Sequence, residues 1–301
     1  QVKKLNDDIQ KNAQIPLFIG TDQEGGMVAR VTEGVVQSPG AMAISACQNT
    51  KYAYQLAYNM GIDLRRLGFN FNFAPVGDVN NNPKNPVINV RSYSENPDIV
   101  SEYVVEAVNG YSDALMMSSI KHFPGHGDTA VDSHIGLPVV DFDEKRLYEM
   151  ELKPFIKAKE LGLPGIMVSH VMFTKYDDKY PATLSKKLVQ GLLRDEIGYE
   201  GLVVTDSLTM KAVFDNFTIE EIAEIAYKQQ YRYNKDIKNG IERFNFFAFS
   251  TQKITQNSRS LKADISTLNI NKPLDNKSTY MYNSLCNLIL CWYSLVGRVH
   301  P

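Results

Sequence analysis

The hydrophobic positions of this chain fall into short runs rich in β-branched residues, and each run ends in polar or glycine-rich residues. Nearly continuous apolar runs of this length are typical of buried parallel strands. Stretches with helical spacing of apolar residues follow the runs, which is the rhythm of βαβ units. The runs occupy residues 16–26, 69–79, 118–127, 164–170 and 201–210, and the helical patterns occupy residues 50–68, 97–114, 143–162 and 184–198.

Polar side chains that can do chemistry come where these runs end. A (β/α) barrel builds its active site at this edge, from the loops that follow its strands. A doubly wound sheet also binds ligands there, but it brings fewer strands to one pocket. The pattern therefore predicts an α/β fold, and within that class a TIM-like (β/α)8 barrel. The side chains at the strand ends are Asp22, Glu24, Asp78, Lys121, His122, Ser169, His170 and Asp206.

The charged residues nearly balance, with 32 Lys and Arg against 34 Asp and Glu, and no basic run stands out. This balance gives no electrostatic surface for nucleic acid or an anionic membrane. No apolar run reaches the roughly 18 residues that a membrane helix needs. We therefore expect a monomer with a small-molecule partner, no nucleic acid and no membrane span. Residues 1–10 lack the apolar core of a signal peptide, so the location stays open between the cytoplasm and the envelope or exterior of a bacterial cell.

The three cysteines are Cys47, Cys286 and Cys291. They have no C-x-x-C spacing, and their odd number fits neither a disulfide framework nor a thiolate zinc site. We expect three buried thiols without a chemical role.

The segment KHFPGHGDTAVDSH, residues 121–134, holds three of the five histidines in the chain. Its two glycines and one proline describe an irregular loop that leaves a strand, and such loops tend to carry function. Pro124 and the glycines break any helix, which excludes a zinc site of the HExxH type, although a metal site built from the loop stays possible. Alternatively the loop binds a sugar or a phosphate, and Asp132 fixes the tautomer of His134 so that its imidazole moves protons.

Other strand-end positions admit two interpretations each. Asp206 can be a nucleophile or a metal ligand, or it can cap the next helix. Asp22 can bind substrate hydroxyls, or it can also be a helix cap. Arg91 offers a planar donor fork to a ligand, but a single Arg is usually solvated or ion-paired. Because side chains alternate along a strand, we expect at most one of Lys121 and His122 to point into the barrel, unless the strand ends there.

Together and in this order, these blocks resemble the glycoside hydrolase family 3 β-N-acetylhexosaminidases. The resemblance covers residues 1–227, and KHFPGHG followed by DSH is similar to the N-acetylglucosaminidase branch in particular. The matching text is PLFIGTDQEGGMVARV, GFNFNFAPVGDV, NVRSYSENP, KHFPGHGDTAVDSH, GIMVSHVMF and PATLSKKLVQGLLRDEIGYEGLVVTDSLTM.

The resemblance implies a retaining glycosidase that works in two steps, with no metal and no cofactor. It implies that Asp206 is the nucleophile, that His134 is the general acid and base, and that Asp132 is the partner of His134. The implied substrate is a terminal β-linked N-acetylglucosamine on a peptidoglycan fragment or a chitin-type oligosaccharide. The residues implied to bind the sugar are Asp22, Arg30, Arg91, Lys121 and His122.

Compared with this family, the chain lacks the first strand and the last barrel units. On this interpretation residues 1–227 are an incomplete N-terminal barrel domain, and residues 228–301 are an atypical tail rich in Asn, Lys and Ser, irregular or read out of its proper frame. Because an open sheet exposes unpaired strand edges, we expect a chain that is poorly stable or inactive. The alternatives are an inactive or degenerate sugar-binding protein and, with less support, a metal-dependent hydrolase.

Overall fold

A computed structural model of the chain describes residues 1–13, 16–218, 220–222 and 224–225. The predicted tail of residues 228–301 lies outside these ranges, so its boundary and structure stay predictions. The helices are α1 (Val2–Asn12), α2 (Ala41–Ala46), α3 (Lys51–Arg66), α4 (Pro97–Asp113), α5 (Glu144–Glu149), α6 (Lys153–Glu160) and α7 (Lys211–Phe214), with the 3-10 turns η1 (Asn89–Arg91) and η2 (Ala182–Leu184) and the π-helix η3 (Lys187–Glu196). The strands are β1 (Gly20–Thr21), β2 (Gln23–Gly25), β3 (Val28–Ala29), β4 (Phe71–Asn72), β5 (Met117–Phe123), β6 (Val139–Val140), β7 (Gly165–Val168), β8 (Met172–Phe173) and β9 (Leu202–Thr205).

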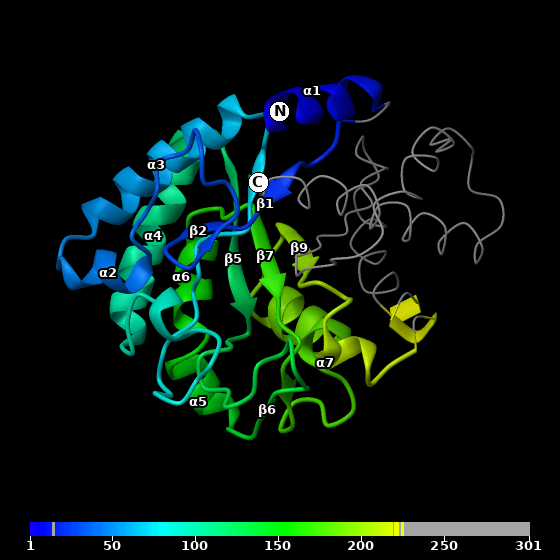
Figure 1. Ribbon diagram of the computed structural model, residues 1–301. Coiled ribbons are helices and arrows are strands. Elements are labelled where there is room, and N and C mark those ends of the chain that lie inside the picture. The colour runs from blue at the N-terminus through cyan, green and yellow to red at the C-terminus, as the bar shows by residue number, and fades with distance from the viewer. Residues whose placement is uncertain (14–15, 219, 223, 226–301) are drawn as a thin grey trace.

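The main sheet has five strands in the order β1-β4-β5-β7-β9, and every neighbouring pair is parallel. This order follows the chain in one direction, whereas a doubly wound sheet reverses its order at a switch point. Helices α3, α4 and α6 pack side by side along one side of the sheet (Figure 1). These features confirm the predicted α/β class. The five parallel strands and the helices packed on them form part of a TIM-like barrel. Within the described residues the sheet is open, with β1 and β9 at its two edges.

Both faces of the sheet are buried, so residues that alternate along a strand pack into two different clusters. On β7, Ile166 belongs to the large core cluster that includes the helices, while Met167 points to the other face and packs in a smaller cluster with Phe71. The same alternation applies to β5, where Ile120 joins the large cluster and Lys121 lies opposite Met167 in the strand register. A lysine is thereby directed to the inner face of the sheet.

Two local predictions are wrong. The predicted helix over residues 143–162 is two helices, α5 and α6, because Pro154 lies in the first turn of α6 and a proline ring is accommodated only there in a helix. Cys47, expected to be buried, is exposed because it lies at the end of the surface helix α2. Cys286 and Cys291 lie outside the described ranges. In the part of the chain that is described, no helix is long and apolar enough to cross a membrane.

Candidate active site

The ends of the parallel strands gather the predicted site residues at one edge of the sheet. Strands β5 and β7 point the same way, toward the loops that hold β6 and α7 (Figure 1). The register joins Val168, the last residue of β7, to Thr205, the last residue of β9. Residues that follow these strands therefore lie side by side although they are far apart in the sequence.

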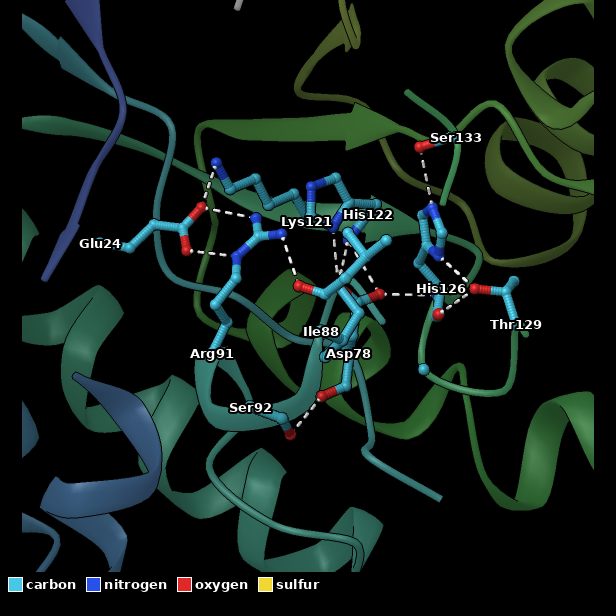
Figure 2. A network of polar contacts seen from close by, with 12 residues as sticks. Glu24, Asp78, Ile88, Arg91, Ser92, Lys121, His122, His126, Thr129 and Ser133 are labelled. Carbon is cyan, nitrogen blue, oxygen red and sulfur yellow. Dashed lines mark hydrogen bonds and ion pairs between the residues drawn. The ribbon is translucent and has the colours of Figure 1, made fainter. Parts of the chain in front are cut away.

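A buried network of four charged residues occupies this edge. Glu24 accepts two hydrogen bonds from Arg91, from Nε at 2.9 Å and from Nη2 at 2.8 Å. Lys121 Nζ lies 2.7 Å from Glu24 Oε1 and 2.7 Å from Asp22 Oδ1. Figure 2 shows Glu24 between its two cationic partners. Burial raises the pKa of Glu24, but the charges of Arg91 and Lys121 outweigh it and hold that pKa far below its usual value. Glu24 therefore stays ionised and fixes both cations.

Asp22 is held by one oxygen and leaves the other free of contacts. Its side chain is 3% exposed, and Oδ2 has no hydrogen-bond partner among the described residues. Buried polar atoms are usually hydrogen-bonded, so an unpartnered carboxylate oxygen is a candidate acceptor for a ligand hydroxyl. Asp22 is not a helix cap, since it is followed by strand β2.

A second buried cluster surrounds Asp78, which the sequence placed at a strand end without a role. Its carboxylate accepts the backbone N–H of His126 at 2.7 Å and lies 2.7 Å from His122 Nδ1 (Figure 2). Burial raises the pKa of Asp78, but the charge of His122 is the main cause that lowers it below its usual value. Because an ionised carboxylate only accepts, His122 Nδ1 carries the proton and Nε2 is left for a ligand.

Lys121 and His122 both contribute to the site, so the strand alternation did not limit them to one. The register of β5 shifts between Lys121 and Phe123, where the strand ends. At this point of the strand Lys121 bonds to Asp22 and Glu24, which follow β1. His122 bonds to Asp78. The sequence allowed both side chains to point into the barrel if the strand ended there, and that is what the structure shows.

His126 makes its ring contacts inside its own loop. Nδ1 lies 2.7 Å from Thr129 Oγ1, and Nε2 lies 3.1 Å from Ser133 Oγ. Burial is the main cause that lowers the pKa of His126 to about 4, so the ring is neutral at neutral pH. These contacts make His126 part of the architecture of the loop.

His134 and Asp132 form a pair that solvent can reach. His134 Nδ1 lies 2.7 Å from Asp132 Oδ1, which also accepts the His134 backbone N–H at 2.8 Å. The side chains are 26% and 25% exposed, whereas His126 is 2% exposed. The carboxylate holds the proton on Nδ1 and leaves Nε2 to exchange a proton with a bound molecule.

Asp206 follows β9 directly and is 8% exposed. Its Oδ1 accepts the backbone N–H of Ser207 at 2.6 Å. Helix α7 begins at Lys211 and its N-cap is Met210, with no side-chain cap bond, so Asp206 is not the cap of that helix. Burial raises the pKa of Asp206, but the charges of His170 and His122 lower it below its usual value. Asp206 is therefore a buried carboxylate that stays ionised at neutral pH.

The predicted residues fall into separate groups at this edge. Asp22, Arg91 and Lys121 share one network, and His134 pairs with Asp132. Arg30, at the end of β3, has its Nε buried with no hydrogen-bond partner in the part of the chain that the structure describes. Over the same part, no group of three or more His, Cys, Asp or Glu side chains is arranged to hold a metal ion.

The sequence of this chain is similar to that of a known protein family. The family model described as the glycosyl hydrolase family 3 N-terminal domain matches residues 1–229. The chain is 44% identical over 224 residues to a beta-hexosaminidase A from Pseudoalteromonas piscicida, a match that covers 69% of this chain and 38% of that relative. It therefore spans well under half the length of that curated protein.

Solved structures give the same relationship. The chain is similar to a glycoside hydrolase family 3 beta-N-acetylglucosaminidase from Paenibacillus sp. str. FPU-7, with a TM-score of 0.74, 46% identity, and coverage of 76% of this chain and 44% of that one. It is also similar to NagZ from Neisseria gonorrhoeae in complex with N-trifluoroacetyl-D-glucosamine, with a TM-score of 0.69, 30% identity, and coverage of 76% and 67%.

Proposed function

This chain belongs to glycoside hydrolase family 3, and from that premise we propose that it is a retaining β-N-acetylglucosaminidase, with its activity in residues 1–227. The proposed reaction removes terminal β-linked N-acetylglucosamine from peptidoglycan fragments or chitin-type oligosaccharides. The names of the similar proteins support this substrate class, and so does the N-trifluoroacetyl-D-glucosamine bound by the Neisseria gonorrhoeae relative.

The first proposed step forms a covalent bond between the sugar and Asp206. A carboxylate oxygen of Asp206 attacks the anomeric carbon while the bond from that carbon to the glycosidic oxygen breaks. His134 donates its Nε2 proton to the leaving oxygen, and Asp132 stabilises the imidazolium that provides it. The lowered pKa of Asp206 supports this role, because only the ionised carboxylate can attack.

The second proposed step releases the sugar with its original anomeric configuration. His134 Nε2 takes a proton from water, whose oxygen attacks the anomeric carbon and displaces Asp206. This return of the proton restores the starting state of both residues. The observation that carries the proposal is the hydrogen bond of 2.7 Å between His134 and Asp132, because it leaves the exposed Nε2 free to move a proton in either direction.

The sugar itself is proposed to bind through Asp22, Arg30, Arg91, Lys121 and His122. Two features support this set: the unpartnered Oδ2 of Asp22, and the orientation of His122, which is bonded through Nδ1 and has Nε2 available. Arg91 and Lys121 are held by Glu24, so their positions do not depend on a bound ligand. Preorganised donors of this kind favour binding because they are not reordered when the ligand arrives.

Release of nitrophenol from aryl glycosides tests this function. The full chain should hydrolyse the aryl β-N-acetylglucosaminide much faster than the aryl β-glucoside, and a chelator should not change the rate. Asp206→Asn should be inactive, whereas Asp215→Asn, which changes an exposed carboxylate in the chain segment just after α7, should keep full activity.

Each other outcome favours another function. Binding of N-acetylglucosamine without hydrolysis would favour the degenerate sugar-binding protein. Activity that a chelator removes would favour the metal-dependent hydrolase. Full activity of Asp206→Asn would contradict the proposed nucleophile.

A further inference from the structure

His170 is a buried histidine at the same edge of the sheet, and the proposed reaction gives it no task. It lies two residues beyond the end of β7 and is 1% exposed. Because β7 and β9 are paired with Val168 opposite Thr205, the chain after β7 runs beside the chain after β9, where Asp206 is located. A fully buried imidazole needs hydrogen-bond partners on both nitrogens.

Both nitrogens of His170 have such partners. Nε2 lies 2.8 Å from the carbonyl oxygen of Ser207, and Nδ1 lies 2.7 Å from Thr183 Oγ1. A carbonyl oxygen can only accept a hydrogen bond, so His170 carries a proton on Nε2. This bond links the end of β7 to the residue that follows Asp206.

Ser207 in turn holds the carboxylate of Asp206 through its backbone N–H, at 2.6 Å. The two bonds form a chain in which His170 fixes the Ser207 carbonyl group and the Ser207 N–H group fixes one oxygen of Asp206. The two bonds lie on the two peptide groups that flank the Cα atom of Ser207, so His170 anchors the residue whose N–H group holds the carboxylate.

The electrostatics of the two side chains are reciprocal. Burial raises the pKa of Asp206, and His170 is the largest cause that lowers it below its usual value. Burial lowers the pKa of His170 below its usual value, and the charge of Asp206 is the largest cause that opposes this. The other charged groups that act on the pair are His122 and Lys121 on Asp206, and His122 and His134 on His170.

We propose that His170 is a positioning residue for the nucleophile: through its hydrogen bond to the Ser207 carbonyl oxygen it anchors the residue whose N–H group holds the Asp206 carboxylate in the orientation for attack. This inference rests on the proposed function of Asp206. It predicts a defect in the chemical steps, since His170 is buried and both of its ring nitrogens are bonded to protein atoms, which leaves neither for the sugar.

The protonated nitrogen of His170 can be measured on the unmodified protein. A nitrogen-labelled histidine spectrum distinguishes the two tautomers, and the His170 signals are assigned through their contact with the methyl group of Thr183. We expect a slowly exchanging proton on Nε2. An unprotonated Nε2 would overturn the proposal, whatever the activity of the protein.

Variants of His170 test the kinetic part. His170→Phe keeps a planar ring but loses both hydrogen bonds, and we expect kcat to fall at least about tenfold with KM nearly unchanged. The acidic limb of the pH profile for kcat/KM should move to higher pH, because burial, which raises the pKa of Asp206, persists without the neighbour that most lowers it. His170→Gln, which retains a donor, should recover part of both losses. His126→Gln, at an equally buried histidine that does not act on Asp206, should leave the acidic limb in place.

The outcomes separate the inference from the proposed function. An unchanged acidic limb in His170→Phe, or equal kcat losses in the Phe and Gln variants with an unchanged limb, would make His170 merely structural. Full activity of Asp206→Asn would instead remove the proposed nucleophile, and the tautomer measurement would then still report on the hydrogen bond to Ser207.

Discussion

Acidification is expected to destabilise the fold through the burial of His126. Burial is the largest cause that lowers its pKa from 6.5 to about 4, followed by repulsion from His122, while the charge of Asp78 opposes both. In the unfolded chain the imidazole takes up a proton near its ordinary pKa. Between these two values the unfolded state therefore binds more protons than the folded state. Stability is present in full above the unfolded pKa and is lost as the pH falls toward the folded pKa.

The size of this loss follows from the two pKa values of His126. One pKa unit corresponds to about 1.4 kcal/mol. The free energy of unfolding should therefore fall by about 2 kcal/mol between about pH 8 and about pH 5, and by about 3 kcal/mol once the folded pKa has been passed. A loss of this size is a large part of the stability of an ordinary domain.

Urea unfolding of the wild-type chain and His126→Gln over this pH range measures the effect. At about pH 8 the variant should be less stable by about 1 to 3 kcal/mol, because it disturbs the buried bonds to Thr129 and Ser133. On acidification the difference should shrink by about 2 kcal/mol, since all other groups titrate in both proteins. Two stability curves that fall in parallel would refute the reasoning, because His126 would then not be a buried neutral histidine.

Packing and charge give two further expectations. Gly127→Ala should lower the melting temperature strongly, since its Cβ would lie 1.7 Å from the Val79 carbonyl oxygen, whereas Gly136→Ala in the same loop meets only a methyl group at 3.6 Å. Equal melting temperatures would contradict this close approach. Glu24→Gln should lower the free energy of unfolding, measured in urea, by about 3 kcal/mol, because Lys121 and Arg91 lose a buried counter-charge. Unchanged stability would show that the charged network does not stabilise the fold.

The edge of the sheet where the site lies could be predicted from the sequence because parallel strands leave a strong local signal. Their two faces are both buried, so each strand is a continuous apolar run, and the first polar residue after it marks the strand end. Asp22 and Asp206 were found in this way, whereas Lys121 lies inside β5. The pairing of Asp132 with His134 was also predictable, because only one residue separates them in the sequence.

The partners of these residues could not be predicted, because they come from distant parts of the sequence. Glu24 and Arg91 are separated by 67 positions, and Asp78 and His122 by 44. Glu24 and Asp78 could be recognised at strand ends in the sequence. Only the arrangement of the strands in the sheet brings them to Arg91 and His122. His170 was likewise visible, yet its bond to the carbonyl of Ser207 depends on the register between β7 and β9.

Trapping the covalent sugar tests the proposed role of Asp206 most directly. A fluorinated N-acetylglucosaminyl fluoride slows both steps but keeps a good leaving group, so the glycosyl-enzyme accumulates. Mass spectrometry of the digested protein should find one added sugar on the peptide that contains Asp206, and none after the same treatment of Asp206→Asn. A sugar attached to another residue, or complete turnover by the Asp206→Asn variant, would contradict the assignment of Asp206 as the nucleophile.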